Sequence, residues 1–357
     1  MNMKDLPKVE LHLHLDGAVR LETIHELAIK KGIPLASEET EELKLHVVQR
    51  KPGSLADMLE AFYHLVPAIA GDPEALERIA FELCETQASQ GVVYFEVRYS
   101  PHILSNTHPN AMWNAPTAYT GKGTVTPGQV VDCVQRGLER GQAAFKVKAR
   151  SILACVCAYP QWSQDVLEMA LEWKEKGVVG IDIAGTPDGA DEEYDEATIR
   201  VFREAKQRGI HRTVHAGESG TPQHVIQAIN ILGAERIGHG YRILRDEAVY
   251  DRVLRSQIHL ETCPTSSVMT SSVTLSTWNE HPIARFAKDG MNFSLNTDDP
   301  TVFGCTLLSE LQLAKEKIGL TEQEIWNCQM NAAKSSFLPQ DEKAALMKQI
   351  KKEPKGG

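Results

Sequence analysis

Short β-rich runs alternate along the chain with longer helix-like segments. Eight of these runs stand out, and most end in a polar residue or a glycine: Val9–Leu15, Val92–Ser100, Lys146–Cys155, Val178–Gly185, Arg212–Glu218, Arg236–Gly240, Ile258–Thr262 and Asn292–Asp298. Strands that alternate with helices form parallel sheets, because a parallel connection needs a crossover segment that is usually a helix. The pattern therefore predicts an α/β protein with a parallel sheet.

The helix-like segments carry start and stop signals. Ser, Thr or Asp stands at each start, proline occupies the first helical position in two of them, and glycine follows three of the ends. The predicted helices run from Thr126-Pro127 to about Ala144, from Trp162-Ser163 to Lys176-Gly177, over Asp195–Arg208 before Gly209, and from Thr221-Pro222 to Gly233. They place one helix in each gap between the second and the sixth predicted strand.

Eight strands favour a closed (β/α)8 barrel, the TIM-barrel architecture, and leave an open doubly wound sheet as the alternative. No change in composition divides the chain, so we expect a single domain over residues 1–357. Several extra helices are expected after the first strand, over about 34–90, and more at the C-terminal end, over about 306–352. A loop over 101–126, rich in Pro, Asn, Gly and Thr, is typical of a lid or pocket wall.

Composition and charge narrow the classes of partner. The 357 residues are 42% hydrophobic and 24% charged, as in an ordinary globular protein, and 38 basic against 48 acidic residues leave a formal net charge of −10. An acidic chain of this kind is a poor candidate for binding nucleic acid or anionic lipid. Small neutral or cationic partners stay open.

The sequence also bears on the compartment. No apolar run approaches the roughly 18 residues that span a membrane, and the first residues lack the apolar core of a secretory signal. The seven cysteines are dispersed and odd in number, which indicates reduced thiols. We therefore expect a cytoplasmic protein with no membrane span.

The first candidate for chemistry is a pair of histidines at the end of the first predicted strand. His12 and His14 are two residues apart, so they point to the same face of a strand, and reactive residues of barrels gather at such strand ends. Two imidazoles on one face are typical of half a metal site. The alternative is an exposed edge strand. Val9 and three leucines on the other face favour a central strand, and hence the metal site.

Two further strand ends carry groups suited to ligation or proton transfer. The fifth predicted strand ends in His215-Ala216-Gly217-Glu218, where His215 is a candidate third ligand and Glu218 a candidate general acid. A carboxyl group near a metal and away from water can have a raised pKa that suits this role. His239 lies between two glycines after the sixth strand and suits a general base. A loop histidine bonded to solvent is an equally good interpretation of His239 alone.

Two adjacent aspartates follow the eighth predicted strand. Asp298 and Asp299 would be costly to place at the mouth of a barrel without a balancing cation, and a divalent metal would supply one. Adjacent side chains diverge, so Asp298 is the candidate ligand and Asp299 would face a substrate. Turn and helix-capping chemistry before Pro300 is the alternative, and it explains only one of the two residues.

Three histidines and one aspartate at strand ends of one barrel match the ligands of a catalytic zinc ion, which keeps one position for water. Zinc lowers the pKa of bound water from 15.7 to about 7. With Glu218 and His239 to move protons, the residues predict hydrolysis or hydrolytic deamination, with one Zn²⁺ per chain.

The same residues resemble those of the adenosine deaminase family, within the metal-dependent amidohydrolase superfamily. The matching segments are Pro7–Gly17, Val97–Pro101, Asp182–Gly185, His211–Glu218, Arg236–Tyr241, Cys263-Pro264 with Ser266-Ser267, Ser294–Pro300 and Asn331–Phe337. They extend over nearly the whole chain, and they are specific in combination.

The resemblance implies a (β/α)8 barrel and a reaction. The zinc ligands it implies are His12, His14, His215 and Asp298. Glu218 would donate a proton to N1 of the purine, while a metal-activated water oriented by His239 and Asp298 attacks C6. Adenosine or 2′-deoxyadenosine would then yield inosine or 2′-deoxyinosine and ammonia, in purine nucleoside catabolism and salvage.

The resemblance also implies how a nucleoside is held. Asp299 would bond to N7, the Gly185 amide to N3 and Asp16 to the ribose 5′-hydroxyl, with His14 also beside the substrate. Adenine deaminases of the superfamily tend to carry Glu at the position of Asp16, so Asp16 favours a nucleoside over a free base.

Departures and rival functions remain. Thr265 stands where vertebrate members usually have Trp, and Val156 where Met is common, which leaves the substrate range open. One rival is a deaminase of adenine or of an N6-substituted nucleotide. Another is a catalytically idle barrel that binds a cell-surface protein, a partner that the sequence does not identify.

Overall fold

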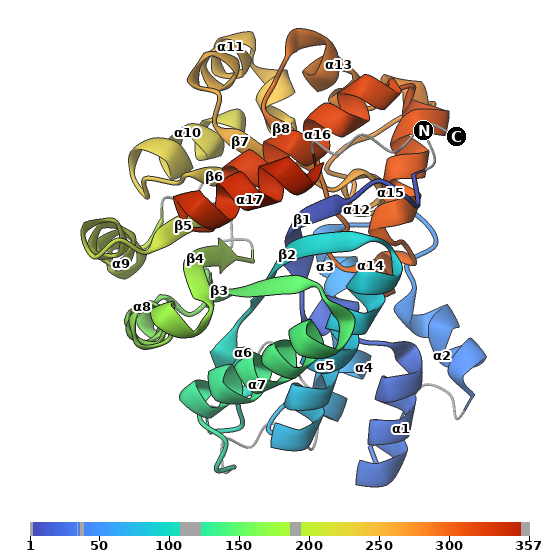
Figure 1. Cartoon of the computed structure of the whole chain (residues 1–357), viewed down its shortest axis with the longest axis vertical. Coiled ribbons are helices and arrows are strands. Elements are labelled where there is room, and N and C mark those ends of the chain that lie inside the picture. Colours follow the sequence, from blue (N-terminus) through green and yellow to red (C-terminus); the bar gives the residue numbers. More distant parts are fainter. Residues whose placement is uncertain (1–2, 34, 36–38, 108–122, 186–193, 351–357) are drawn as a thin grey trace.

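The computed structural model describes residues 3–33, 35, 39–107, 123–185 and 194–350 of the chain. Eight parallel strands follow one another around a barrel in chain order (Figure 1): β1 Lys8–His14, β2 Val92–Tyr99, β3 Lys148–Val156, β4 Val178–Ala184, β5 His211–Ala216, β6 Arg236–His239, β7 His259–Thr262 and β8 Phe293–Leu295. Two backbone bonds join the first strand to the segment after the last. His14 N donates to Asp298 O at 2.9 Å, and Asp298 N donates to His12 O at 3.1 Å. The prediction of a (β/α)8 barrel is confirmed.

Helices cover the outside of the barrel and fill its longer connections. Between β1 and β2 lie α1 Leu21–Lys31, α2 Thr40–Val47, α3 Leu55–Leu59, α4 Phe62–Ile69 and α5 Pro73–Ser89. The connections from β2 to β8 contain α6 Pro101–Leu104, α7 Pro127–Phe145, α8 Ser163–Glu172, α9 Glu196–Gln207, α10 Pro222–Asn230, α11 Glu247–Ser256, α12 Pro264–Met269 and α13 Pro282–Asp289. After β8 come α14 Pro300–Phe303, α15 Leu307–Leu313, α16 Glu322–Ser335 and α17 Gln340–Ile350. Helices thus lie where extra ones were expected, after the first strand and at the C-terminal end.

The helix signals in the sequence act as predicted in two of the four predicted helices, α7 and α9. Thr126 and Gln129 form a capping box at the start of α7, with Pro127 in the first turn. The Asp195 side chain accepts from Ala197 N at the start of α9. In the part of the chain that the structure describes, no side chain caps the start of α8 or of α10. Helix α8 ends at Glu172 rather than at Lys176, and α10 ends at Asn230 rather than at Gly233.

All strands except β1 are shorter than the predicted runs, as at the start of β3 and at the end of β8. β3 begins at Lys148, since Lys146 has a left-handed φ of 57° and ends the preceding helix. β8 ends at Leu295 because Asn296 turns its side chain back to bond Thr262 O at 3.1 Å. This early end matters for function, because it frees the residues after Asn296 to turn into the mouth of the barrel.

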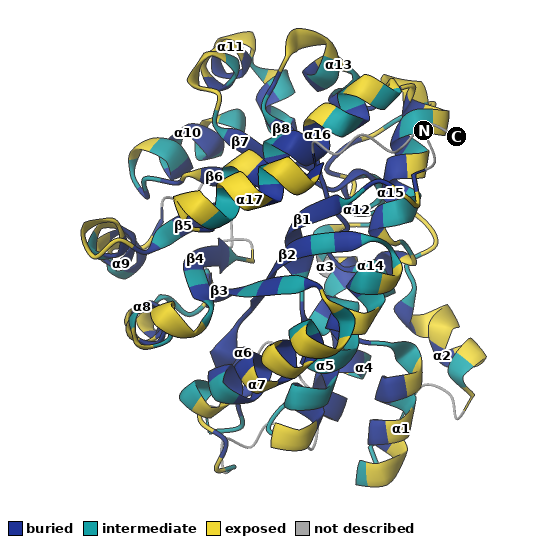
Figure 2. Ribbon diagram, viewed as in Figure 1, coloured by how far each residue is buried: buried dark blue, intermediate teal, exposed yellow. Residues whose placement is uncertain are grey.

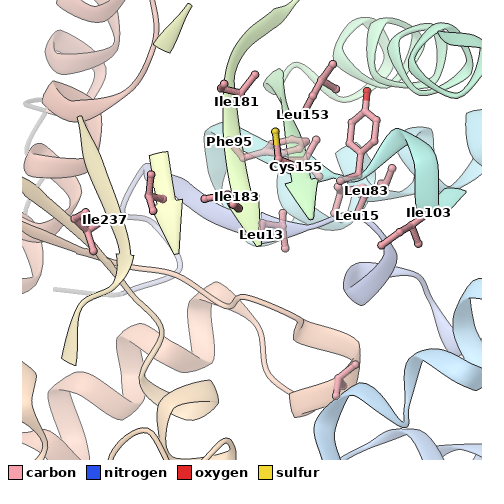
Figure 3. Close-up of a cluster of buried hydrophobic side chains, with 14 of the residues drawn as sticks. Leu13, Leu15, Leu83, Phe95, Ile103, Leu153, Cys155, Ile181, Ile183 and Ile237 are labelled. Carbon is pink, nitrogen blue, oxygen red and sulfur yellow. The ribbon is translucent and has the colours of Figure 1, made fainter. Parts of the chain in front are cut away.

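β1 is a central strand that is buried on both faces. Val9 and Leu11 pack against residues of α16 and α17, while Leu13 belongs to the main hydrophobic cluster. Figure 3 shows Leu13 among the buried hydrophobic side chains of this cluster. Strands of parallel barrels are covered on both sides in this way. The exposed-edge alternative for the two histidines is therefore excluded.

The exposed residues lie on the outer faces of the surrounding helices, as the yellow stripes on α9, α11 and α17 show (Figure 2). Among the described residues, no helix combines the length and the apolar character that a membrane crossing requires.

Candidate active site

Four side chains that the sequence singled out converge at the mouth of the barrel. One ligand atom from each of His12, His14, His215 and Asp298 lies within 4.8 Å of all the others. Asp298 Oδ1 is 3.0 Å from His12 Nε2 and 3.2 Å from His14 Nε2. His14 Nε2 and His215 Nε2 are 3.3 Å apart. Residues from β1, β5 and the segment after β8 thus surround one point.

The hydrogen bonds behind this cluster fit a metal cation at that point. His12 Nδ1 lies 2.7 Å from Glu261 Oε2, and His215 Nδ1 lies 2.9 Å from Asp182 Oδ2. A carboxylate accepts, so each ring carries its proton on Nδ1 and turns the Nε2 lone pair toward the cluster. Two lone pairs and a carboxylate that face one another repel unless a cation lies between them. Three imidazole nitrogens and one carboxylate oxygen are the donors of a catalytic zinc site.

Close packing and an unusual backbone shape the site. Asp298 and His239 have φ angles of 66° and 68°, in the left-handed region that non-glycine residues rarely adopt. Such conformations cluster at functional sites, where the surrounding structure holds them in place. At Gly238 the space for a side chain is the constraint, because a Cβ there would lie only 2.8 Å from His12 Cε1. β6 therefore carries a glycine where it faces His12.

Glu218 and His239 lie together beside the cluster. Glu218 Oε2 is 3.5 Å from His239 Nε2, which is in turn 4.0 Å from Asp298 Oδ2. Burial, reinforced by the negative charge of Asp298, raises the pKa of Glu218 to about 8. Burial lowers the pKa of His239 well below its usual value, so this ring is neutral. The pair therefore offers a proton on a carboxyl group and a free lone pair on an imidazole.

Asp298 and Asp299 diverge as expected for adjacent side chains. Burial alone would raise the pKa of Asp298, but its interactions with the neighbouring histidines hold that pKa well below its usual value. Asp298 Oδ2 also accepts from Ser266 Oγ at 2.7 Å. Asp299 has the opposite character, because burial and the charge of Asp298 raise its pKa well above the usual value.

Asp299 lies against the first connection of the barrel. A Cβ on Gly17 would lie 1.8 Å from Asp299 Oδ1, so only a glycine leaves room for this carboxyl group. Asp299 Oδ1 is buried and has no hydrogen-bond partner among the described residues. The next residue back, Asp16, also has a pKa raised by burial. Both carboxyl groups are thus held close to the metal cluster without being part of it.

One cavity brings these groups together. Its lining includes every predicted site residue except His12, which is fully buried beneath it: His14, Asp16, Gly185, His215, Glu218, His239, Asp298 and Asp299. The opposite wall is apolar and comes from the helices after β1 and β2: Leu55, Met58, Leu59, Phe62 and Ile103. A cavity with one polar, ionisable side and one apolar side suits a small, flat, partly polar molecule.

Two residues that depart from the family pattern have different positions. Val156 lines the cavity. Thr265 instead bonds the buried carboxyl group of Glu310, through its hydroxyl group and through its backbone N at 2.9 Å.

The predicted loop over 101–126 is described only outside residues 108–122. Of its described part, Ile103 in α6 lines the cavity.

The structure adds residues to which the sequence analysis gave no chemical role. Asp182 and Glu261 hold the rings of His215 and His12, Ser266 bonds Asp298, and Arg98 bridges the two carboxylates. The sequence did contain a signal that could have indicated a role for three of these residues. Arg98, Asp182 and Glu261 are charged residues inside predicted buried strands. Buried charges must be paired. Which residues form the pairs depends on the arrangement of the strands.

The sequence matches those of known enzymes over nearly its whole length. A model of the adenosine deaminase family matches residues 7–353. The adenosine deaminase of Mus musculus is 45% identical over 351 residues, covering 97% of each chain. That of Xenopus laevis is 46% identical over 342 residues, covering 96% of this chain and 94% of its own.

Solved structures of related enzymes share the fold. An adenine deaminase from Arthrobacter aurescens superposes with a TM-score of 0.82 at 25% identity, covering 97% of this chain and 98% of its own. The N6-mAMP deaminase of Arabidopsis gives 0.80 at 26% identity, covering 98% of both chains. From its sequence, its barrel and the residues at the barrel's mouth, this chain belongs to the adenosine deaminase family of metal-dependent hydrolases.

Proposed function

We propose that this protein catalyses the zinc-dependent hydrolytic deamination of adenosine and 2′-deoxyadenosine to inosine and 2′-deoxyinosine, with release of ammonia, in purine nucleoside catabolism and salvage. The observation that carries the proposal is the meeting of a three-histidine, one-aspartate cluster with a protonated glutamic acid in one cavity. The match to adenosine deaminases over nearly the whole chain supports the choice of substrate.

The metal would be one Zn²⁺ per chain, held by His12, His14, His215 and Asp298. When bound, it supplies a Lewis acid that lowers the pKa of water to about 7. Glu261 and Asp182 fix the two ring orientations that leave Nε2 free for the metal. The apolar wall of the cavity limits access of bulk water, which strengthens the electrostatic interactions inside.

Proton movements would be carried by two residues. Glu218 holds a proton at neutral pH because burial raises its pKa to about 8, and it would donate that proton to N1 of the purine ring. His239 is neutral and would accept a proton from the attacking water. Asp298, whose Oδ2 lies 4.0 Å from His239 Nε2, would orient the same water.

The substrate would be held by groups around the cavity. Asp299, with an unpaired Oδ1 and a raised pKa, would bond to N7 as a proton donor. The Gly185 amide would bond to N3, Asp16 to the 5′-hydroxyl of the ribose, and His14 would lie beside the substrate. Asp16 is also the reason to propose a nucleoside as the substrate rather than a free base.

The test is the ultraviolet absorbance change of adenosine on mixing with purified protein, with adenine and N6-methyl-AMP in parallel cuvettes. Adenine and N6-methyl-AMP are included because structural relatives are named for them. Turnover of adenosine alone, lost on removal of zinc and restored by adding it back, is the expected result. Turnover of adenine or N6-methyl-AMP in place of adenosine would overturn the substrate assignment. Zinc binding without any turnover would favour a binding protein.

Two wider proposals accompany the reaction. We propose that residues 1–357 form a single catalytic domain, since helices from both ends of the chain pack on one barrel. We also propose a cytoplasmic location, which the seven cysteines support: all seven lie in the described part of the chain and all are free thiols.

A further inference from the structure

We propose that Arg98 is a positioning residue that orients two metal ligands, His12 and His215, at the same time. Its single guanidinium group holds both Asp182, the partner of His215, and Glu261, the partner of His12. The inference rests on the proposed role of these histidines as zinc ligands. It assigns to one side chain on β2 the joint orientation of ligands on β1 and β5.

The guanidinium group of Arg98 bonds in two directions. Nη1 donates to Asp182 Oδ2 at 2.9 Å, and Nη2 donates to Glu261 Oε2 at 2.6 Å. Glu261 Oε2 is also the oxygen that receives the Nδ1 proton of His12, at 2.7 Å. Asp182 Oδ2 lies 2.9 Å from His215 Nδ1, whose hydrogen bond goes to the other oxygen of the same carboxylate, Oδ1, at 3.2 Å. A shift of the guanidinium group would therefore move both carboxylates against their histidines.

A third bond ties Arg98 to the ligand strand itself. Nη2 also donates to the backbone oxygen of Leu11 at 2.6 Å, next to His12 on β1. Arg98 therefore joins β1, β4 and β7 across the inside of the barrel from its own place on β2. The planar fork of an arginine can do this with fixed geometry, whereas the ammonium group of a lysine is a single point charge.

Both carboxylates have their remaining oxygen occupied. Glu261 Oε1 accepts from Arg236 Nε at 2.7 Å and from Thr213 Oγ1 at 2.8 Å. Asp182 Oδ1 accepts from Ile183 N at 2.7 Å. The carboxylates can therefore not turn to compensate for the loss of Arg98. In Glu261 these contacts hold the oxygen on the far side from His12, whereas both oxygens of Asp182 lie near His215 Nδ1, and Arg98 holds one of them.

The alternative is that Arg98 only stabilises the barrel as a buried cation. Two other buried arginines separate these roles. Arg236 also bonds Glu261, but its further contacts are Glu96 and the Ser335 backbone, so it reaches one ligand-holding carboxylate. Arg212 lies on β5, pairs with Glu235 and bonds backbone oxygens, and it reaches neither.

The experiment compares Arg98→Lys with the matched control Arg212→Lys. Both keep a positive charge in a buried position, whereas Arg98→Met would leave the buried Asp182 without an arginine partner and Glu261 with Arg236 alone, which would endanger folding. The zinc dissociation constant of each metal-free protein is measured by competition with a chromophoric chelator, and its unfolding temperature is recorded. We expect zinc binding to weaken about 10–100-fold in Arg98→Lys, the usual effect of losing a residue behind the ligands, and about twofold at most in Arg212→Lys.

A double-mutant cycle then tests the mechanism. Glu261→Gln and Asp182→Asn are each made alone and combined with Arg98→Lys. If Arg98 acts through both carboxylates, each double variant loses less zinc affinity than the product of its two single losses. Independent, multiplicative losses would overturn the inference, and so would an Arg98→Lys protein that binds zinc as tightly as the Arg212→Lys control. A wild-type protein that binds no zinc would instead overturn the proposed function.

Discussion

Replacing Glu218 by glutamine removes the proton donor of the proposed reaction while keeping the size of the side chain. The magnitude follows from the surroundings of this group. With its pKa raised from 4.5 to about 8 by burial and by Asp298, Glu218 is about nine-tenths protonated at pH 7. A glutamic acid with the ordinary pKa would be protonated about once in 300 molecules. The site therefore supplies the acid form about 300-fold more often.

This gain lies within the 10²–10⁴-fold that general acid catalysis contributes in enzymes. We expect Glu218→Gln to lower kcat by roughly that range. Zinc binding should be unchanged, because Glu218 supplies none of the four atoms in the ligand cluster. The loss should also persist at low pH, since the amide cannot be converted into an acid.

The assay is the absorbance change of adenosine at saturating substrate, with zinc per chain determined on the same sample. Glu247→Gln is the matched control, since Glu247 is an exposed residue at the start of α11 that pairs with Arg285. Turnover of Glu218→Gln within threefold of the control, at equal zinc content, would refute the assignment of Glu218 as the acid. Loss of zinc together with activity would instead show that Glu218 supports the metal site.

Three further predictions concern the metal and the core. His215→Ala should abolish stoichiometric zinc binding and turnover, and metal analysis showing one zinc per chain would contradict its role as ligand. Gly238→Ala should weaken zinc binding roughly tenfold, because the new Cβ would lie 2.8 Å from His12 Cε1; an unchanged chelator titration would argue against this coupling. Glu310, whose pKa burial raises from 4.5 to about 7, stays protonated in the folded protein while the unfolded chain ionises. The free energy of unfolding should therefore fall by about 3 kcal/mol between pH 4.5 and 7, and Glu310→Gln should remove this loss. Urea unfolding of the wild-type and Glu310→Gln proteins at pH 4.5 and 8 should show a difference between them only at pH 8.

The order of the elements and most candidate residues could be predicted from local patterns. The two-residue spacing of His12 and His14 on a strand, and the position of His215 near the end of β5, follow from periods that neighbours in the chain determine. Element ends were harder to predict. β8 stops at Leu295 because Asn296 bonds across to β7, a contact between residues 34 positions apart.

The residues behind the metal site were the main omission. Arg98, Asp182 and Glu261 lie on β2, β4 and β7, and each appears in the sequence as a charged residue within a largely apolar strand. Their pairing depends on which side chains point inward at the same height in the barrel. That height is set by the register of seven successive strand pairs, which no local pattern contains.

By itself, the sequence determined the alternation of strands and helices, the acidic charge, and the identity of the residues at the strand ends, because these depend on side-chain chemistry and on short-range periodicity. Only the tertiary structure decided that His14 and His215, 201 positions apart, approach to 3.3 Å, and that burial converts Glu218 into an acid with a pKa of about 8. The physical reason is that distance and solvation depend on closure of the barrel. Closure brings the ends of β1, β5 and β8 around one cavity and excludes water from the charges held there.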